Sequence, residues 1–186
     1  MSLILITPPS SEPVTLAEAK AHLKVDTGDD DALLSSLIVA ARARAEWHSG
    51  RALVTQGWTL WLDEWSQDGL IEIPLPPLQS VTSVTTYALN DEAHILDPLL
   101  YQVDAASAPA LLALRDTVLP PTDLRAINAV AIAFTAGYGD ADAVPQPVKQ
   151  AILQIVADLY AHRGDEAALV SPTAEALLAP YRIFKL

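Results

Sequence analysis

The chain has 186 residues, a length typical of one domain that can bury a substantial core. It contains no cysteine, which excludes disulfides and thiolate chemistry, and its net charge of −12 argues against attraction to nucleic acid phosphates. No apolar run reaches the roughly 18 residues of a membrane span. The N-terminus lacks the basic start and the cleavage site of a secretion signal, so we expect synthesis in the cytoplasm.

The chain is predicted to open with an extended arm over residues 2–13, followed by a short helix. Thr15 and Glu18 have the spacing of a capping box, in which each side chain satisfies a free backbone donor near the other. The helix is expected to run to about Lys24.

A long helix over residues 29–51 is the element around which we expect the chain to be organised. Aspartates at residues 29–31 are expected to cap its start, and Gly50 to end it. Arg42 lies four residues before Glu46, away from the apolar side, which predicts a weak surface ion pair. The apolar stripe recurs at three- and four-residue steps and consists of Leu33, Leu34, Leu37, Ile38, Ala41 and Ala45.

A mostly antiparallel β region is predicted next. Short stretches rich in β-forming residues cover residues 53–62, 70–73, 81–89, 101–103, 111–115 and 129–134. The proline-rich run at 74–78 lacks ladder donors, so it predicts an edge or a connection. The sequence does not predict which strands pair.

A second long helix begins near Pro147, which suits a first-turn position, and Gly164 is expected to end it. Lys149 is expected to face away from its apolar stripe. That stripe consists of Val148, Ala151, Ile152, Ile155, Val156 and Leu159, and we expect it to pack against the stripe of the first long helix. A short helix over residues 173–178 follows.

Together these elements predict an α+β fold with a mainly helical core and an antiparallel β insertion between the helical blocks. We expect a single domain over residues 1–186. Its parts are N-terminal helices at 14–51, the insertion at 52–146, C-terminal helices at 147–179 and a tail at 180–186. The insertion contains twelve acidic and two basic residues, so it holds −10 of the net charge.

The motifs predict no catalytic residue, no metal ligand and no cofactor. The aspartates near residue 30 lack the spacing of a calcium loop, and Gly137 and Gly139 precede no phosphate-loop lysine. His22, His48, His94 and His162 lack paired ligand spacing.

Two alternatives stay open on the residues alone. Trp58, Trp61 and Trp65, with acids such as Asp63 and Glu64, could serve a small carbohydrate-binding or hydrolytic protein. An unrelated interaction module of bacterial origin is the other.

The order of the segments is more specific than any one of them. The chain reads TLAEAKAHLK at 15–24, DDALL at 30–34, SGRAL at 49–53, a tryptophan-bearing strand, LPPLQSV at 75–81, FTAGYG at 134–139 and PVKQAI at 147–152. Over residues 14–182 this succession resembles the head–tail connector (adaptor) proteins of long-tailed phages, prophages and gene transfer agents.

The resemblance implies a structural role without catalysis. Members of that family form a ring, typically of twelve copies, beneath the portal protein, and the ring continues the DNA channel toward a tail-side connector or stopper protein. The chain would assemble in the host cytoplasm and reside at the head–tail junction of a virion or gene-transfer-agent particle. DNA would pass without specific binding, which suits the acidic insertion, and no membrane is involved.

The C-terminal tail is the candidate docking segment. It combines apolar and basic side chains, namely Tyr181, Arg182, Ile183, Phe184, Lys185 and Leu186. An exposed apolar tail is hard to explain in a monomer, so we expect this segment to dock on a neighbouring subunit or on the portal.

Overall fold

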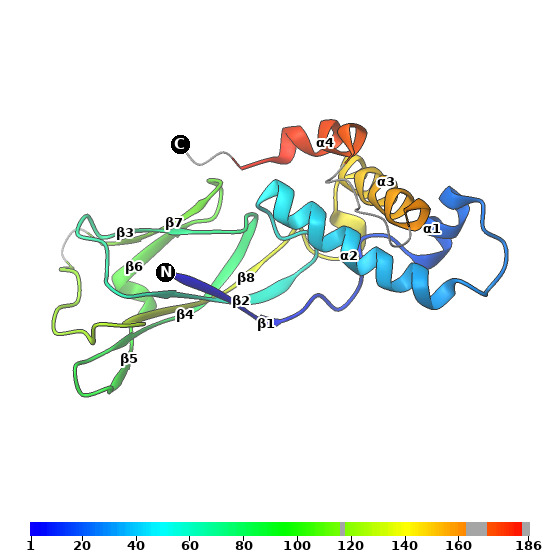
Figure 1. Cartoon of the computed structure of the whole chain (residues 1–186). Coiled ribbons are helices and arrows are strands. Elements are labelled where there is room, and N and C mark those ends of the chain that lie inside the picture. The colour runs from blue at the N-terminus through cyan, green and yellow to red at the C-terminus, as the bar shows by residue number, and fades with distance from the viewer. Residues whose placement is uncertain (116–117, 163–170, 184–186) are drawn as a thin grey trace. The chain divides into compact units, whose positions relative to one another are not determined.

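The computed structural model describes residues 1–115, 118–162 and 171–183 and confirms the α+β class (Figure 1). The chain divides into two compact units. Met1–Pro8 and Thr55–Gly137 form the first, here called the sheet unit. Pro9–Val54 and Tyr138–Leu186 form the second, here called the helical unit.

A five-stranded antiparallel sheet dominates the sheet unit, with the strand order β1-β2-β8-β4-β5. Its strands are β1 (Ser2–Thr7), β2 (Gln56–Leu62), β4 (Leu78–Tyr87), β5 (Ala93–Ile95) and β8 (Val130–Ala136). The central strand β8 buries Val130, Ile132 and Phe134, as expected of a strand paired on both edges and covered by other residues.

A smaller antiparallel sheet has the order β3-β7-β6. It consists of β3 (Leu70–Ile73), β6 (Tyr101–Asp104) and β7 (Ala110–Leu114), with the 3-10 helix η1 (Pro98–Leu100) before β6. Pro74 follows β3 directly, and the proline-rich run connects β3 to β4, which confirms the prediction that it forms no central strand.

Two strands of the larger sheet differ from the sequence-based expectation. Residues 2–7 were predicted as part of an extended arm, but they form β1 and pair with β2. The three-residue strand β5 was not predicted at all, since a strand this short shows no alternation.

The helical unit contains four α-helices and two short 3-10 helices in its described residues. They are α1 (Leu16–Leu23), α2 (Asp31–Ser49), η2 (Ala141–Ala143), α3 (Gln146–Ala161), α4 (Pro172–Leu178) and η3 (Ala179–Tyr181). The capping box is confirmed: the Glu18 N–H donates to Thr15 Oγ1 at 3.2 Å, and the Thr15 N–H donates to Glu18 Oε2 at 2.7 Å. Gly164 lies outside the described residues.

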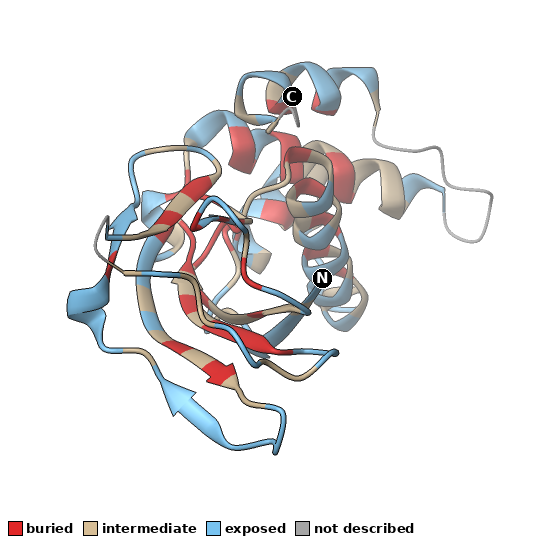
Figure 2. Cartoon of the chain, turned by 90° about the vertical axis from the view of Figure 1, so that its left-hand side faces the viewer, coloured by how far each residue is buried: buried red, intermediate tan, exposed pale blue. Residues whose placement is uncertain are grey.

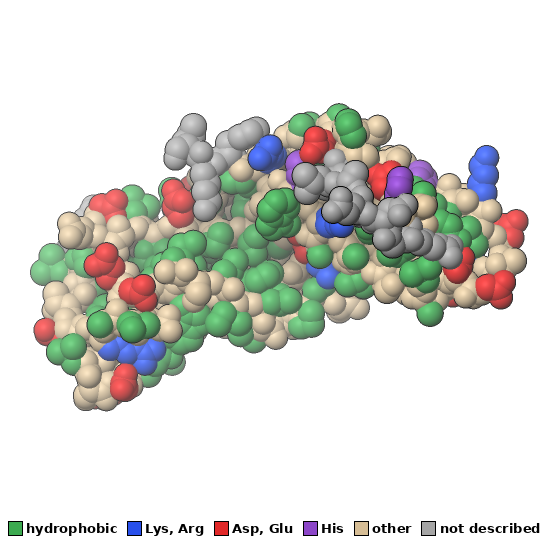
Figure 3. All heavy atoms as spheres, in the orientation of Figure 1, with side chains coloured by type: hydrophobic (Ala, Val, Ile, Leu, Met, Phe, Trp, Pro, Cys, Tyr) green, Lys and Arg blue, Asp and Glu red, His purple; other side chains and the backbone are tan. Residues whose placement is uncertain are grey.

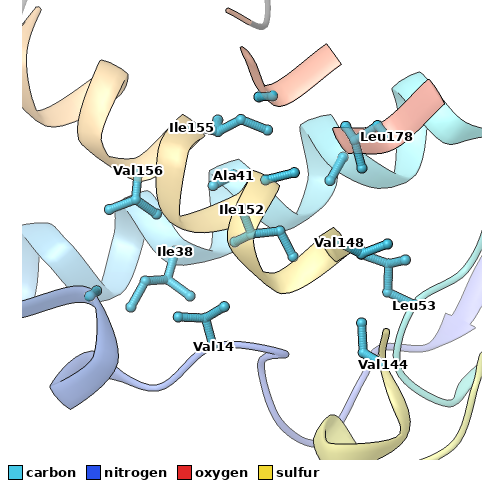
Figure 4. Packing of buried hydrophobic residues seen from close by; sticks show 14 of the residues in the cluster. Val14, Ile38, Ala41, Leu53, Val144, Val148, Ile152, Ile155, Val156 and Leu178 are labelled. Atoms are coloured by element: carbon cyan, nitrogen blue, oxygen red, sulfur yellow. The ribbon is translucent and has the colours of Figure 1, made fainter. Parts of the chain in front are cut away.

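The two predicted apolar stripes meet in the core of the helical unit (Figure 4). Ile38 and Ala41 on α2 share one cluster with Ile152 and Ile155 on α3, and Leu178 on α4 belongs to the same cluster. The helices turn their buried faces toward one another (Figure 2). The predicted packing of α2 on α3 is therefore confirmed, but Leu37 is only partly buried at its margin and Leu33 is not part of the cluster.

The aspartates before α2 do not cap it as predicted. Asp30 is the N-cap residue, but its side chain makes no capping hydrogen bond. The Tyr160 hydroxyl on α3 instead donates to Asp30 Oδ2 at 2.5 Å. Asp31 pairs with Lys20 on α1 at 2.6 Å, so these carboxylates join helices to one another.

The predicted surface pair of Arg42 and Glu46 is a largely buried network. The two side chains are 12% and 13% exposed and lie 2.5 Å apart, and Arg42 Nε also lies 2.8 Å from Glu12 Oε2. Glu46 Oε1 accepts a hydrogen bond from the Leu53 N–H at 3.0 Å. Lys149 is likewise buried rather than turned to solvent. Glu12, thirty residues before Arg42 in the sequence, is the distant residue that pairs with Arg42.

Candidate functional site

The predicted docking segment begins against its own helical unit. Tyr181 packs on the hydrophobic core, and its carbonyl accepts a hydrogen bond from Arg51 Nε. The Ile183 N–H donates to the Ser49 carbonyl at 2.9 Å, which satisfies a carbonyl left free where α2 ends. Residues 181–183 are therefore seated on α2 of the same chain.

Gly50 ends α2 with a φ of +71°, a left-handed conformation that favours glycine. Ile183 packs beside this turn, since its Cβ lies 3.5 Å from the point where a Gly50 Cβ would stand, which is an ordinary van der Waals distance. Phe184, Lys185 and Leu186 lie outside the described residues. Docking of the tail on a partner stays a prediction. Because Tyr181 and Ile183 already contact their own chain, we now expect only Phe184, Lys185 and Leu186 to dock.

The described acids of the sheet unit all lie on its surface, and Figure 3 shows several of them among apolar side chains. These nine carboxylates are Asp63, Glu64, Asp68, Glu72, Asp91, Glu92, Asp97, Asp104 and Asp123. Asp116 lies outside the described residues. Hydrogen bonds from Ser66 and the Leu70 N–H hold the pKa of Asp68 below its ordinary value, so this carboxylate stays ionised.

The two arginines of the sheet unit are engaged locally. Arg115 Nε donates to the Leu99 carbonyl at 2.9 Å. The Arg125 guanidinium lies 4.1 Å from the centre of the Tyr87 ring and 3.2 Å from Asp91 Oδ1. The surface that this unit offers to a polyanion is therefore strongly negative.

The tryptophans of the sheet unit do not form a shared platform. Trp65 is buried, and the indole nitrogens of Trp58 and Trp65 are both buried. Trp61 stacks on Tyr87 with ring centres 5.7 Å apart. Since Trp58 and Trp61 are three residues apart in β2, they point to opposite faces of the sheet.

An open hollow of about 400 Å³ lies beside Trp65, and its rim includes Asp63, Glu64, Thr122 and Arg125. Across residues 1–115, 118–162 and 171–183, the structure brings together no group of three His, Asp or Glu side chains able to hold a metal ion. In the same residues no helix is long and apolar enough to cross a membrane.

Residues 13–94 match the family model of phage gp6-like head–tail connector proteins. The whole chain is also similar in structure to a chain in the neck of an empty gene transfer agent (GTA) particle, computed with C6 symmetry. The TM-score is 0.83, with 26% identity, over 100% of this chain and 97% of that one. The chain is thus similar to head–tail connector proteins in sequence over residues 13–94, and to neck chains of gene transfer agent particles in its whole fold.

Two further chains from gene transfer agent particles are similar in structure. One comes from the virion of a native gene transfer agent particle, with a TM-score of 0.82 and 27% identity. The other comes from the neck of a native particle computed with C12 symmetry, with a TM-score of 0.81 and 27% identity. Each match covers 100% of this chain and 97% of the other. Among curated proteins, none matches the sequence.

These similarities support a structural adaptor role, and the carbohydrate-binding or hydrolytic alternative is not supported. The buried Trp65 and the stacked Trp61 explain why the tryptophans gave a misleading signal: they pack the sheet unit.

Sequence reasoning missed the exposed apolar residues of this chain. Trp47 on α2 is 81% exposed, and the pattern of the long helix did not identify it as a surface residue. In β1, Ile4, Leu5 and Ile6 are exposed as well. The run of four aliphatic residues from Leu3 to Ile6, followed by Pro8, is a strand signal that could have identified this edge.

Proposed function

We propose that the chain forms a ring at the head–tail junction, on the tail side of the portal protein and next to a tail-side connector or stopper. The ring, of about twelve copies, continues the DNA channel, and it acts as a structural part without a catalytic step. The observation that carries this proposal is the similarity along the whole chain to neck chains solved with C6 and C12 symmetry. The chain assembles in the host cytoplasm and then resides in the particle neck.

In this proposal residues 1–186 act as a single connector domain. The helical unit is its core, since helices from both ends of the chain bury a common cluster there. Residues 52–146 are the insertion, which carries the acidic surface.

The acidic surface suits a channel that DNA must traverse. Nine exposed carboxylates stand against two arginines that are engaged with Tyr87, Asp91 and the Leu99 carbonyl. Binding to DNA requires Lys and Arg to displace counterions from phosphates, and this surface offers little of either. DNA can therefore move past it without being held.

We expect the purified chain to bind duplex DNA more weakly than the ~10⁻⁶ M that marks the tight end of non-specific binding at physiological salt. Fluorescence anisotropy across a salt series measures this. Micromolar affinity with a steep salt slope would contradict the proposed channel lining.

Neutralising three exposed acids of the sheet unit, as Glu64→Gln, Glu72→Gln and Asp123→Asn together, should leave the fold intact and increase retention of DNA in assembled particles. The matched control makes the same charge change in the helical unit, as Asp26→Asn, Asp29→Asn and Glu175→Gln. Equal DNA retention in both triple variants and the wild type would place these sheet-unit acids outside the channel.

Two truncated variants test the proposed docking of the C-terminal tail. Removing residues 184–186 should leave the melting temperature largely unchanged and block ring formation or attachment to the portal. Removing residues 181–186 should also lower the free energy of unfolding by about 1–3 kcal/mol, because two hydrogen bonds of ~0.5–1.5 kcal/mol each and the packing of Tyr181 are lost.

Circular dichroism melts and a particle-assembly assay on both truncations provide the measurements. A full-length variant with Phe184→Ser and Leu186→Ser tests whether the apolar side chains carry the effect. Normal assembly without residues 184–186 would show that the tail is dispensable.

A further inference from the structure

The strand β1 forms one edge of the five-stranded sheet and is unusually apolar for an edge. Ile4, Leu5 and Ile6 are 48%, 42% and 61% exposed, and no charged side chain lies between Ser2 and Thr7. Natural proteins commonly protect an edge strand with a charge, a proline or a bulge within it. Here a register irregularity near Ile6 and the prolines at 8 and 9 act only at its C-terminal end.

The strand β5 forms the opposite edge of the same sheet, and all three of its residues are exposed (Figure 2). The Leu96 N–H donates to the Val84 carbonyl at 2.8 Å. Because backbone groups alternate along an antiparallel pair, Ala93 and Ile95 direct their N–H and C=O groups away from β4. The Ile95 side chain is 75% exposed. Both edges of the sheet thus present an open backbone beside apolar side chains.

We infer that β1 of one copy pairs with β5 of the next copy, so that the sheet continues from subunit to subunit; the inference rests on the proposed ring. An open strand edge is satisfied best by another extended strand, which supplies backbone hydrogen bonds along its length. The occupant is a second copy because both complementary edges belong to this chain.

The symmetry of a ring selects this pairing over the alternative. Two β1 strands pairing with each other would use the same surface on both copies, which gives a two-fold contact and stops at a dimer. A ring needs a head-to-tail contact between two different surfaces, repeated until it closes. The β1 and β5 edges are different surfaces at the two ends of one sheet, so they meet this requirement.

The variant Leu5→Lys tests the β1 edge, since a lysine on an edge strand opposes the approach of a further strand. Leu70→Lys is its matched control: Leu70 lies on the edge strand β3 of the smaller sheet and is also 42% exposed. Mass photometry and electron microscopy of purified protein and of particles score ring formation. We expect rings from the wild type and Leu70→Lys, at least a tenfold loss of rings with Leu5→Lys, and similar melting curves for all three.

The direction of pairing is tested with cysteines, which are unambiguous because the chain has none. Under oxidation, Leu5→Cys with Ile95→Cys in one chain should give a covalent ladder of oligomers from assembled particles, whereas either single variant should give monomer. A dimer band from Leu5→Cys alone would overturn the inference in favour of β1–β1 pairing.

Normal rings from Leu5→Lys would overturn the pairing and leave the proposed function standing. A second outcome would also overturn the pairing of β1 with β5. If Leu5→Lys forms rings as the wild type does but these rings fail to attach to tails, β1 contacts a different protein of the neck. The proposed function fails separately, if the wild-type chain is absent from the neck of complete particles.

Discussion

Shortening Ile155 to alanine is expected to lower the free energy of unfolding by about 2–5 kcal/mol. Ile155 is 1% exposed and lies in the cluster between α2, α3 and α4. The loss combines the transfer free energy of the removed methyl groups with the cavity that they leave. Close packing of the surrounding helices limits how far this cavity can collapse.

Two further alanine variants on α2 test whether the loss in free energy of unfolding follows the burial of the side chain. Leu37 is partly buried at the margin of the same cluster, so Leu37→Ala should cost less than Ile155→Ala. Val39 is 45% exposed, and Val39→Ala should change the free energy of unfolding by at most about 0.5 kcal/mol.

Urea unfolding followed by circular dichroism at helical wavelengths provides the measurement, because this signal reports on the helical unit rather than on the sheet unit. A loss below about 1 kcal/mol for Ile155→Ala would show that this residue is not a core residue.

Periodicity predicted the helices well because it depends on local sequence. The stripe of α3 and the capping box of α1 are each contained within one short segment, so no knowledge of distant residues is needed. The strand order could not be predicted, since it depends on pairings between residues far apart. β1 pairs with β2 across about fifty to sixty residues, and nothing within residues 2–7 indicates that partner.

The difference between local patterns and contacts of distant residues also explains two wrong expectations, namely the exposure of Arg42 and Lys149 and the free position of the tail. Helical spacing places Arg42 and Lys149 away from the apolar stripes, but Lys149 is buried and Arg42 is paired with Glu12 from another segment. The tail could be recognised as apolar from its composition. Its contacts with Ser49 and Arg51 could not, because they join positions about 130 residues apart.

Replacing Arg42 with methionine should lower the free energy of unfolding at pH 7 by about 3–5 kcal/mol, as for a buried charge pair that loses one partner. Arg42 pairs with both Glu12 and Glu46, so its removal takes away the cation that these two carboxylates share. Arg44→Met on the same helix is the matched control, since Arg44 takes no part in this network. Urea unfolding of both variants gives the comparison.

The loss should shrink as the pH falls. Burial already raises the pKa of Glu12 above its ordinary value, against the lowering effect of Arg42. Without Arg42 the pKa of Glu12 rises further, so between the unfolded and folded pKa values the folded state binds more protons than the unfolded state. Stability of the variant then increases as the pH falls through that range.

Unfolding at pH 5 and pH 7 therefore separates two roles of Arg42. A smaller loss at pH 5, together with partial recovery when Glu12→Gln is added to Arg42→Met, would assign the effect to charge. An equal loss at both pH values would instead mean that the aliphatic part of Arg42 stabilises the helical unit by packing, since that contribution does not depend on protonation. The buried position of the network between α2 and the segment that carries Glu12 favours the first result.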